Sequence, residues 1–536
     1  MGNTLFLNGK VYTPSGWAEA LLTNGQTIAA VGAASDLAFM AGDAERVDLG
    51  GRLMLPGLID GHMHFLSFAL SLEQADLTGS RSAGEVRDRV RTFINRERPA
   101  PGEWITGRGW NHELFDDGRI FERGDLDDLA PANPMVLTRV CGHVAVLNSA
   151  ALKQLGITGD TRFAGGVVDL DEGGEPTGVL RETAVSWVRS QKPVPDRVRL
   201  RQLAARAGAA AAAFGLTSLH SDDLGPAGDD WRAVYDLYSG LDAEGKMPVR
   251  ITQQLKLRDR AALDDFLASG FRTGDGSPAF HTGPLKILTD GSMGGRTALL
   301  REEYADMPGE LGVAIYEAEE LNDLVNAAHG AGMQIAMHAI GDGALDMCLN
   351  ALEGALTANP ADDARHYIVH CQTGDIDQYG RMARLGVGAA IQPVFVPSDR
   401  LMAVKRLGKK RAGEAYAWRT LMDLGIFMSA GSDSPVETLD PFAGIHAAVT
   451  RQDEAGEPAG GWNPDQRLSL KEAVGFYTEG GAYASFEERR KGALAPGMLA
   501  DLTVPDRDIF SVLPDEISGT RSLLTMMGGR FTHREI

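Results

Sequence analysis

The sequence is poor in cysteine and has no long hydrophobic run. Three cysteines occur among 536 residues, at positions 141, 348 and 371, and so few scattered thiols cannot form a disulfide framework. No apolar stretch approaches the roughly 20 residues that a membrane-spanning helix needs. The opening residues MGNTLFLNGKVY lack the basic and apolar segments of a secretory signal. We therefore expect a cytoplasmic protein with no membrane partner.

Positive charge is also scarce. Lysine and arginine total 52 against 73 aspartates and glutamates, which gives a net charge of -21 and a pI near 5.0. Nucleic acid calls for a basic face, so we expect no nucleic-acid partner. Hydrophobic residues make up 43% and charged residues 23%, which is typical of a globular protein. We expect a small-molecule ligand, and a homodimer is left open.

Eight strand-like runs alternate with helical patterns through most of the chain. Such alternation favours βα units around a parallel sheet, and eight units predict a (β/α)8 TIM barrel of class α/β. The predicted strands are LIDGHMHF (58–65), LTSLHS (216–221), VRITQQL (249–255), PLKILTD (284–290), MQIAMHA (333–339), HYIVH (366–370), GVGAAIQ (386–392) and GIFMSAG (425–431).

Both ends of the chain read as short strands separated by turn dipeptides, among them Asn8-Gly9, Asn24-Gly25 and Gly528-Gly529. Neither end has enough strands to be stable alone. We therefore predict one small β-sandwich from 1–56 and 490–536, with the barrel over 57–489. Residues 70–205 break the rhythm after the first barrel strand. We expect an insertion that roofs the active site, with a helix over AGEVRDRVRTFINRE and a hairpin over GGVVDLDEGGEPTGVL.

Candidate metal ligands stand where the predicted barrel strands end. His62 and His64 are two residues apart on the first strand, so their side chains project to one face. Alone, such a pair is equally compatible with polar residues at a strand end. Because chemistry in these barrels sits at the carboxyl ends of the strands, we ask what the others carry there. They carry Lys286, His338, His370 and Asp433. Imidazoles and carboxylates are typical ligands of zinc and similar cations.

This ordered set resembles the amidohydrolase superfamily. The stretches LPGLIDGHMH, LKILTDGSMGGRTA, HAIGDGALD and GSDSPV further resemble amidohydrolase family 3, the branch that includes N-substituted formamide deformylase, over nearly the whole chain. The resemblance implies a metal-dependent hydrolase that cleaves a non-peptide carbon-nitrogen bond, in an amide, N-formyl or N-acyl group, through a metal-bridging hydroxide. The metal would be zinc, with two ions if Lys286 is carboxylated and one otherwise.

The resemblance also implies a role for each ligand. His62 and His64 would hold one ion together with Asp433, His338 and His370 would hold the other, and carboxylated Lys286 would bridge them. Asp433 would also be the catalytic residue that moves the proton. A buried lysine loses its charge more readily than an exposed one, which favours the carboxylation. The alternative is an unmodified Lys286 paired with Asp290.

Other readings stay open. A deaminase of the superfamily would place a glutamate three residues after His338, where Gly341 stands. An esterase or a metal-free regulatory homologue would share the fold, although the latter should lose ligands and this chain keeps all six. For substrate contacts we propose six residues, of which Asn111 departs from the acidic residue usual in the family: Trp110, Asn111, His143, His220, Arg296 and Gln392. To structural roles we assign His281, His329, His366, His446, His533 and the thiol of Cys371.

Overall fold

The computed structural model describes residues 2–140, 142–163, 165–191, 194–228 and 230–536, which leaves Cys141 outside the described part. The chain divides into two compact units, and each is described by itself. The first comprises Met1–Phe68 and Arg197–Ile536, and the second comprises Ala69–Asp196. No helix of the described chain is long and apolar enough to span a membrane.

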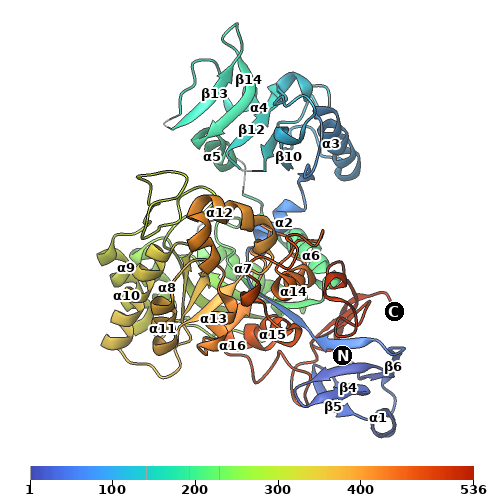
Figure 1. The fold of residues 1–536 in the computed structure, drawn as a ribbon. Coiled ribbons are helices and arrows are strands. Elements are labelled where there is room, and N and C mark those ends of the chain that lie inside the picture. The colour runs from blue at the N-terminus through green and yellow to red at the C-terminus, as the bar shows by residue number, and fades with distance from the viewer. Residues whose placement is uncertain (1, 141, 164, 192–193, 229) are drawn as a thin grey trace. The chain divides into compact units, whose positions relative to one another are not determined.

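The first unit contains an eight-stranded parallel sheet that curls into a nearly closed barrel (Figure 1). Its strands are buried on both faces, which explains why they read as short apolar runs rather than as alternating patterns. All eight predicted strands are present in the predicted order, so the TIM-barrel prediction is confirmed. They are β8 (Leu58–Met63), β15 (Leu216–Ser221), β16 (Arg250–Leu255), β17 (Phe280–Leu288), β18 (Ile335–Ala339), β19 (Tyr367–His370), β20 (Gly388–Ile391) and β21 (Met428–Ala430).

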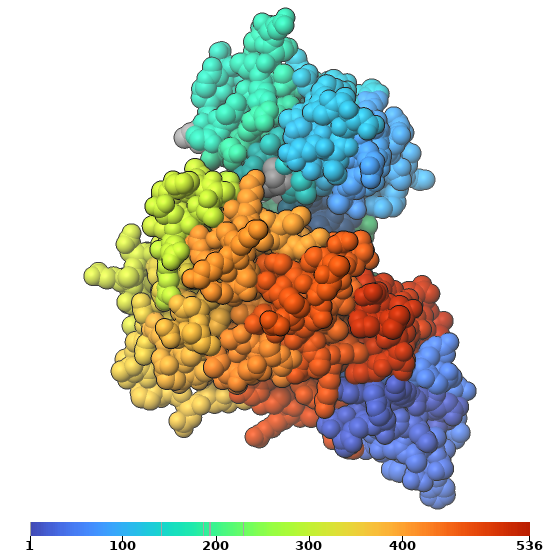
Figure 2. Space-filling view, viewed as in Figure 1, coloured from blue at the N-terminus to red at the C-terminus, as the bar shows by residue number. Residues whose placement is uncertain are grey.

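Helices follow the barrel strands along the chain. In α9 the stripe predicted from the sequence is buried, with Leu321, Leu324, Val325 and Ala328 facing inward. The barrel helices are α6 (Arg197–Ala213), α7 (Trp231–Ala243), α8 (Arg260–Ala268), α9 (Ala318–Gly330), α10 (Asp342–Ala358), α11 (Ile376–Leu385), α12 (Phe395–Glu414), α13 (Trp418–Asp423), α14 (Pro441–Thr450), α15 (Leu470–Phe476) and α16 (Glu479–Ala484). Segment 395–455, which includes α12 and α14, forms the orange surface in the middle of Figure 2.

Strands from both ends of the chain form a β-rich region, as predicted. One sheet has the order β5-β4-β1-β6 and the other β24-β23-β22-β7-β2-β3. The ladder between β7 and β22 joins the two ends, with Leu55 opposite Thr503. The strands are β1 (Thr4–Leu7), β2 (Lys10–Thr13), β3 (Gly16–Ala18), β4 (Ala20–Asn24), β5 (Thr27–Gly32), β6 (Glu45–Asp48), β7 (Leu53–Pro56), β22 (Leu502–Pro505), β23 (Ser522–Met527) and β24 (Arg530–Arg534), and helix α1 (Ala34–Met40) follows β5. One apolar core combines side chains of both ends, such as Phe6 and Leu502.

The second unit is built on a six-stranded sheet of order β13-β14-β12-β11-β10-β9. The predicted helix is α3 (Ala83–Glu97), and the predicted hairpin is β13 (Gly166–Leu170) with β14 (Pro176–Glu182). The sequence did not indicate the other strands, because they are short and lie between turn-rich segments. They are β9 (Ala75–Asp76), β10 (Ile105–Trp110), β11 (Met135–Arg139) and β12 (Val144–Leu147), accompanied by α4 (Ser149–Leu155) and α5 (Thr183–Ser190). The predicted end of the insertion, residue 205, falls inside α6, which belongs to the first unit.

Candidate metal centre

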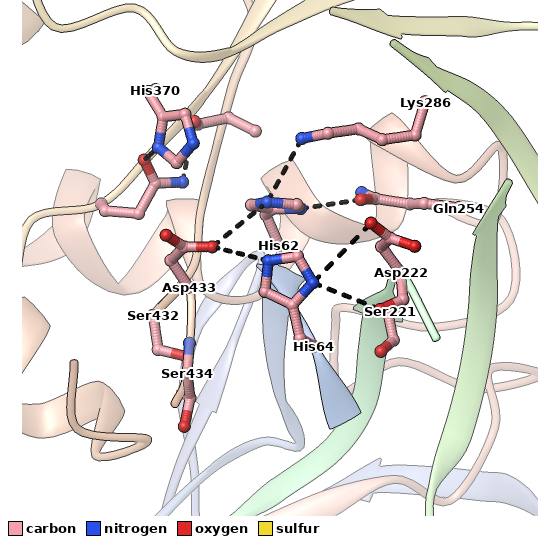
Figure 3. Close-up of polar contacts among 12 residues, drawn as sticks. His62, His64, Ser221, Asp222, Gln254, Lys286, His370, Ser432, Asp433 and Ser434 are labelled. Atoms are coloured by element: carbon pink, nitrogen blue, oxygen red, sulfur yellow. Dashed lines mark hydrogen bonds and ion pairs between the residues drawn. The ribbon is translucent and has the colours of Figure 1, made fainter. Parts of the chain in front are cut away.

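The six predicted ligands come together at the carboxyl ends of the barrel strands. Asp433 Oδ1 lies 3.4 Å from His62 Nε2 and 3.1 Å from His64 Nε2 (Figure 3). Lys286 Nζ lies 3.3 Å from His62 Nε2. The rings of His338 and His370 are 4.5 Å apart between centroids. Residues from five separate strands or strand ends therefore share one small volume.

Three of these side chains already have the spacing of a cation site. Single donor atoms of His62, His370 and Asp433 lie within 4.8 Å of one another, and all three residues are buried. His370 and Asp433 have positive φ angles, 75° and 57°. Residues other than glycine adopt this left-handed backbone conformation at a cost of roughly 1–2 kcal/mol. Two ligand positions are thus held in a conformation that the surrounding barrel must stabilise.

A hydrogen-bond acceptor stands behind each histidine. His62 Nδ1 lies 2.7 Å from Gln254 Oε1, and His370 Nδ1 lies 2.7 Å from Gln392 Oε1. Such an acceptor favours the proton on Nδ1 and leaves the Nε2 lone pair for a metal. For the other two histidines the acceptors are the carboxylate of Asp290, 2.8 Å from His338 Nδ1, and the main-chain oxygen of Asp222, 3.2 Å from His64 Nδ1.

The carboxylate of Asp290, which accepts from His338, is itself held in place by backbone hydrogen bonds. Its two carboxylate oxygens also accept hydrogen bonds from the backbone N–H groups of Leu299, Ile340 and Gly341. The alternative in which Asp290 pairs with Lys286 is therefore wrong. The sequence suggested that pair because the two residues lie two pleats apart on one strand, but β17 ends at Leu288 and the chain then turns Asp290 toward β18.

Lys286 lies in the interior of the barrel with 2% of its surface exposed. Burial lowers its pKa to about 8, although the nearby carboxylates of Asp222 and Asp433 oppose the shift. The neutral amine is therefore more readily formed here than on an exposed lysine. Within the described residues, its hydrogen-bond contact is the ring of His62.

Most of the other ionisable groups have pKa values that favour the protonation states required for binding a cation. Burial lowers the pKa of His62 to about 4 and that of His370 well below its usual value. Burial alone would raise the pKa of Asp433, but hydrogen bonds with His62 and His64 bring it well below the ordinary range. His64 is the exception, since its bond with Asp433 raises its pKa against the effect of burial. Neutral imidazoles and an ionised carboxylate are what metal binding requires.

The barrel closes at a seam between β8 and β21, and Asp60 fastens it. Its buried carboxylate accepts hydrogen bonds from the backbone N–H groups of His62 and Ser432, both at 3.1 Å, and from the Ser432 hydroxyl at 2.5 Å. Across the same seam the N–H of Asp433 donates to the carbonyl of His62 at 2.8 Å. A Cβ at Gly431 would lie 2.5 Å from the His62 nitrogen. The seam therefore sets the positions of ligands from the first and the last strand.

Three of the residues predicted to contact substrate lie in the barrel unit. Gln392 is buried behind His370, which it orients. His220 is 1% exposed on β15, and its Nε2 atom has no hydrogen-bond partner among the described residues. Arg296 forms a two-point ion pair with Asp306 at 3.1 and 2.9 Å. Substrate contact stays a prediction for all three.

The other three lie in the second unit. Trp110 is fully buried in the core of that unit, and its indole N–H donates to the carbonyl of Leu137 at 2.9 Å. Asn111 accepts a hydrogen bond from Arg139 at 2.7 Å. His143 Nδ1 lies 2.9 Å from Glu182 Oε2. Their proposed contact with substrate likewise remains a prediction.

All of the residues assigned to structure except His446 have hydrogen-bond or sulfur contacts within the described chain. His366 Nε2 lies 3.0 Å from His329 Nδ1, and His366 Nδ1 accepts from the backbone of Ile335. His281 lies 3.1 Å from the hydroxyl of Thr252, and His533 lies 3.1 Å from the carbonyl of Ser522. Cys371 is buried beside a methionine sulfur of α11, and burial raises its pKa to about 12. His446 is buried without a hydrogen bond in the described chain.

A parallel barrel that gathers four imidazoles, a carboxylate and a buried lysine at the carboxyl ends of its strands is the architecture of metal-dependent hydrolases. The chain belongs to the amidohydrolase family, whose model matches residues 45–533. It is 34% identical to the putative amidohydrolase YtcJ of Bacillus subtilis, over 92% of this chain and 91% of that protein. It is 28% identical to N-substituted formamide deformylase of Arthrobacter pascens, over 99% and 98% of the two chains.

The fold comparison agrees. An uncharacterized metal-dependent hydrolase from Pyrococcus horikoshii OT3 superposes with a TM-score of 0.79 at 29% identity, covering 96% of this chain and 99% of that one. The resemblance to amidohydrolase family 3 is thereby confirmed, and the protein is a hydrolase of the metal-dependent amidohydrolase superfamily.

Sequence reasoning missed three residues that position the ligands, namely Gln254, Asp222 and Asp60. Gln254 and Asp222 stand at or just after strand ends, where an additional polar residue at the catalytic face was a usable signal. Asp60 precedes His62 by two positions and shares its side of the strand. A buried acid in an otherwise apolar run such as LMLPGLID indicates a partner elsewhere, but the sequence does not identify Ser432 as that partner.

Proposed function

We propose that the protein hydrolyses a non-peptide carbon-nitrogen bond, in an N-formyl, N-acyl or other amide group of a small molecule. The observation that carries the proposal is that His62, His370 and Asp433 have the spacing of a cation site, with His64, Lys286 and His338 beside them and every histidine Nδ1 turned to an acceptor. The bond type is supported by the likeness to N-substituted formamide deformylase.

The donor set fits divalent cations, with zinc favoured by its nitrogen and carboxylate ligands. His62, His64 and Asp433 would hold one ion, and His338 and His370 a second. When bound, such ions polarise a carbonyl group and lower the pKa of water toward neutrality. The fit rests on the histidine orientations and on the ionised carboxylate of Asp433, whose pKa is held well below its usual range.

Lys286 would serve as a bridging anion once carboxylated. Its neutral amine adds to carbon dioxide, forming a nitrogen-carbon bond and releasing one proton, and the resulting carbamate offers two oxygens. The burial that lowers the pKa of Lys286 to about 8 supplies the nucleophilic form. Without carboxylation the site would hold one ion.

Asp433 would move the proton. Its Oδ1 atom is hydrogen-bonded to His64 Nε2 at 3.1 Å, and its pKa is held well below the usual value. The carboxylate would accept a proton from the attacking water and return it to the departing nitrogen, which makes the amine a leaving group. A departing nitrogen needs this proton more than a departing ester oxygen does.

The test is a panel of N-formyl amines, N-acyl amines, lactams, esters and aminopurines, assayed with the metal-loaded protein. We expect amide or formamide hydrolysis to exceed ester hydrolysis and deamination. Asp433→Asn should retain most of its metal and lose about 10²- to 10⁴-fold in kcat. Near-normal turnover by that variant would show that the proton moves elsewhere, and preferred deamination or ester cleavage would replace the proposed bond type.

A further inference from the structure

A cavity lies between the start of α12 and α14, near the metal centre. It has a volume of about 390 Å³ and all its lining residues belong to the first unit. We call it the α12–α14 pocket. Its polar lining consists of Ser398, Glu437, Thr438, His446, Asp453, Glu454 and Ser518, and Val394, Pro397, Ala443 and Ala455 complete the wall.

The pocket is negatively charged. Glu437 accepts a hydrogen bond from Ser398 at 2.7 Å, and Glu454 accepts one from Ser518 at 3.1 Å. Neither glutamate takes part in an ion pair among the residues that the structure describes. Of the three lining acids, Asp453 alone has a cationic partner, Arg400, at 2.9 Å. Two carboxylates therefore face the cavity without a counter-charge.

His446 provides an independent indication of a ligand. The residue is 3% exposed and lines the pocket, yet its ring forms no hydrogen bond within the described chain. Its ring nitrogens are not among the fully buried polar atoms without a partner, so they keep a surface that a molecule in the pocket can reach. Burial lowers the pKa of His446, although nearby carboxylates, Glu454 among them, oppose the shift, and a neutral imidazole nitrogen accepts a hydrogen bond.

Two of the lining residues belong to segments that also carry residues of the metal centre. Glu437 is four residues beyond Asp433 in the loop that follows β21, and Val394 is two residues beyond Gln392. Phe395, the first residue of α12, stacks on the ring of His370 with 6.0 Å between centroids. The pocket therefore lies beside the segments that carry Asp433 and that orient His370.

We propose that the α12–α14 pocket binds a cationic group, an ammonium or a guanidinium, of the substrate whose amide is cleaved at the metal centre. The statement that an amide is cleaved rests on the proposed function. The preference for a cationic group is argued from the pocket alone. Glu437 and Glu454 supply the opposite charge, and the His446 ring accepts one of the N–H bonds. The substrate class would be monoacylated or formylated diamines and their guanidino counterparts.

The first experiment measures binding without catalysis. Alkylammonium and alkylguanidinium ions of increasing length are titrated into the metal-loaded protein, and calorimetry measures their binding affinity. Alkanols of matched length serve as neutral probes. We expect binding of the cations and not of the alkanols. Glu437→Gln and the exposed Glu454→Gln should each weaken cation binding about tenfold. The control is Glu457→Gln, which makes the same change in the same loop outside the pocket lining.

The second experiment compares formylated diamines with formylated alkylamines in which a methyl group replaces the ammonium. At one chain length the cationic member should have a kcat/KM about tenfold higher, and Glu454→Gln should abolish the preference through KM. Equal binding of cations and alkanols, or no effect of either glutamate variant, overturns the pocket proposal. Cation binding that both variants weaken, without cleavage of any amide, supports the pocket and refutes the proposed function instead.

Discussion

Asp290→Asn is the sharpest test of how the metal centre is oriented. The carboxylate of Asp290 accepts hydrogen bonds from the His338 ring, at 2.8 Å, and from three backbone N–H groups. An asparagine of the same shape has a single acceptor oxygen, and its NH₂ group would face donors. Whichever way the amide turns, part of this network is left unpaired.

The expected magnitude follows from that count. One or two buried donors without a partner cost about 1–3 kcal/mol each, so the variant should unfold at lower denaturant concentration. If the carboxylate also orients His338 and increases its basicity, affinity for the ion at that histidine should fall about 10- to 100-fold, which is about 1.4–2.7 kcal/mol. Chelator competition measures the affinity, and denaturant unfolding measures the stability.

The two readouts separate two roles. Lower stability with unchanged metal affinity would mean that Asp290 serves the backbone turn alone, and the orientation argument would fail. Asp323→Asn is the matched control, because Asp323 is an exposed residue of α9 paired with Arg260. That variant should match the wild type in metal affinity.

Three further predictions concern the seam, the lysine and the far end of the barrel. Gly431→Ala should lower the metal content of the protein, because the added Cβ would press on His62 and Asp60. The control is Gly354→Ala, at an open helical position, which should leave the metal content unchanged. Equal metal content in the two variants would refute the seam argument. Protein supplied with ¹³C-bicarbonate and metal should show one carbamate carbon by NMR that Lys286→Arg lacks, and absence of the signal from the wild type would exclude the bridging role. Burial lowers the pKa of His366 to about 3, below the usual 6.5, so the unfolded chain takes up the proton first and stability falls as pH drops from 6.5 toward 3. For chelator-treated His366→Asn, the slope of unfolding free energy against pH should be shallower by up to about 1.4 kcal/mol per pH unit, and an unchanged slope would contradict the burial argument.

The barrel could be predicted because its strands are read locally. Runs such as LTSLHS and MQIAMHA combine apolar character, short length and flanking helical patterns, and these properties do not depend on distant contacts. The ligands were predictable for a related reason. Since every parallel strand ends at the same face, polar residues at strand ends must meet, whatever separates them in the chain.

The orienting contacts could not be predicted in this way. They depend on how far a chain travels after its strand ends, as for Asp290, or on a pairing across nearly four hundred residues, as between Asp60 and Ser432. A shift of one residue in a loop would exchange such partners without changing any local pattern. Strands β9 to β12 of the second unit escaped prediction for another reason, since such short strands are recognisable mainly once they are paired.

The ladder that joins β7 to β22 also has a consequence for biosynthesis. Strand β7 leads through Gly57 directly into β8, whose far end carries His62, and Gly57 donates a hydrogen bond to Asp501. The ribosome therefore releases the first ligands hundreds of residues before the segments that anchor them and close the ring. The ladder that anchors the start of β8 can form only once those final strands have emerged.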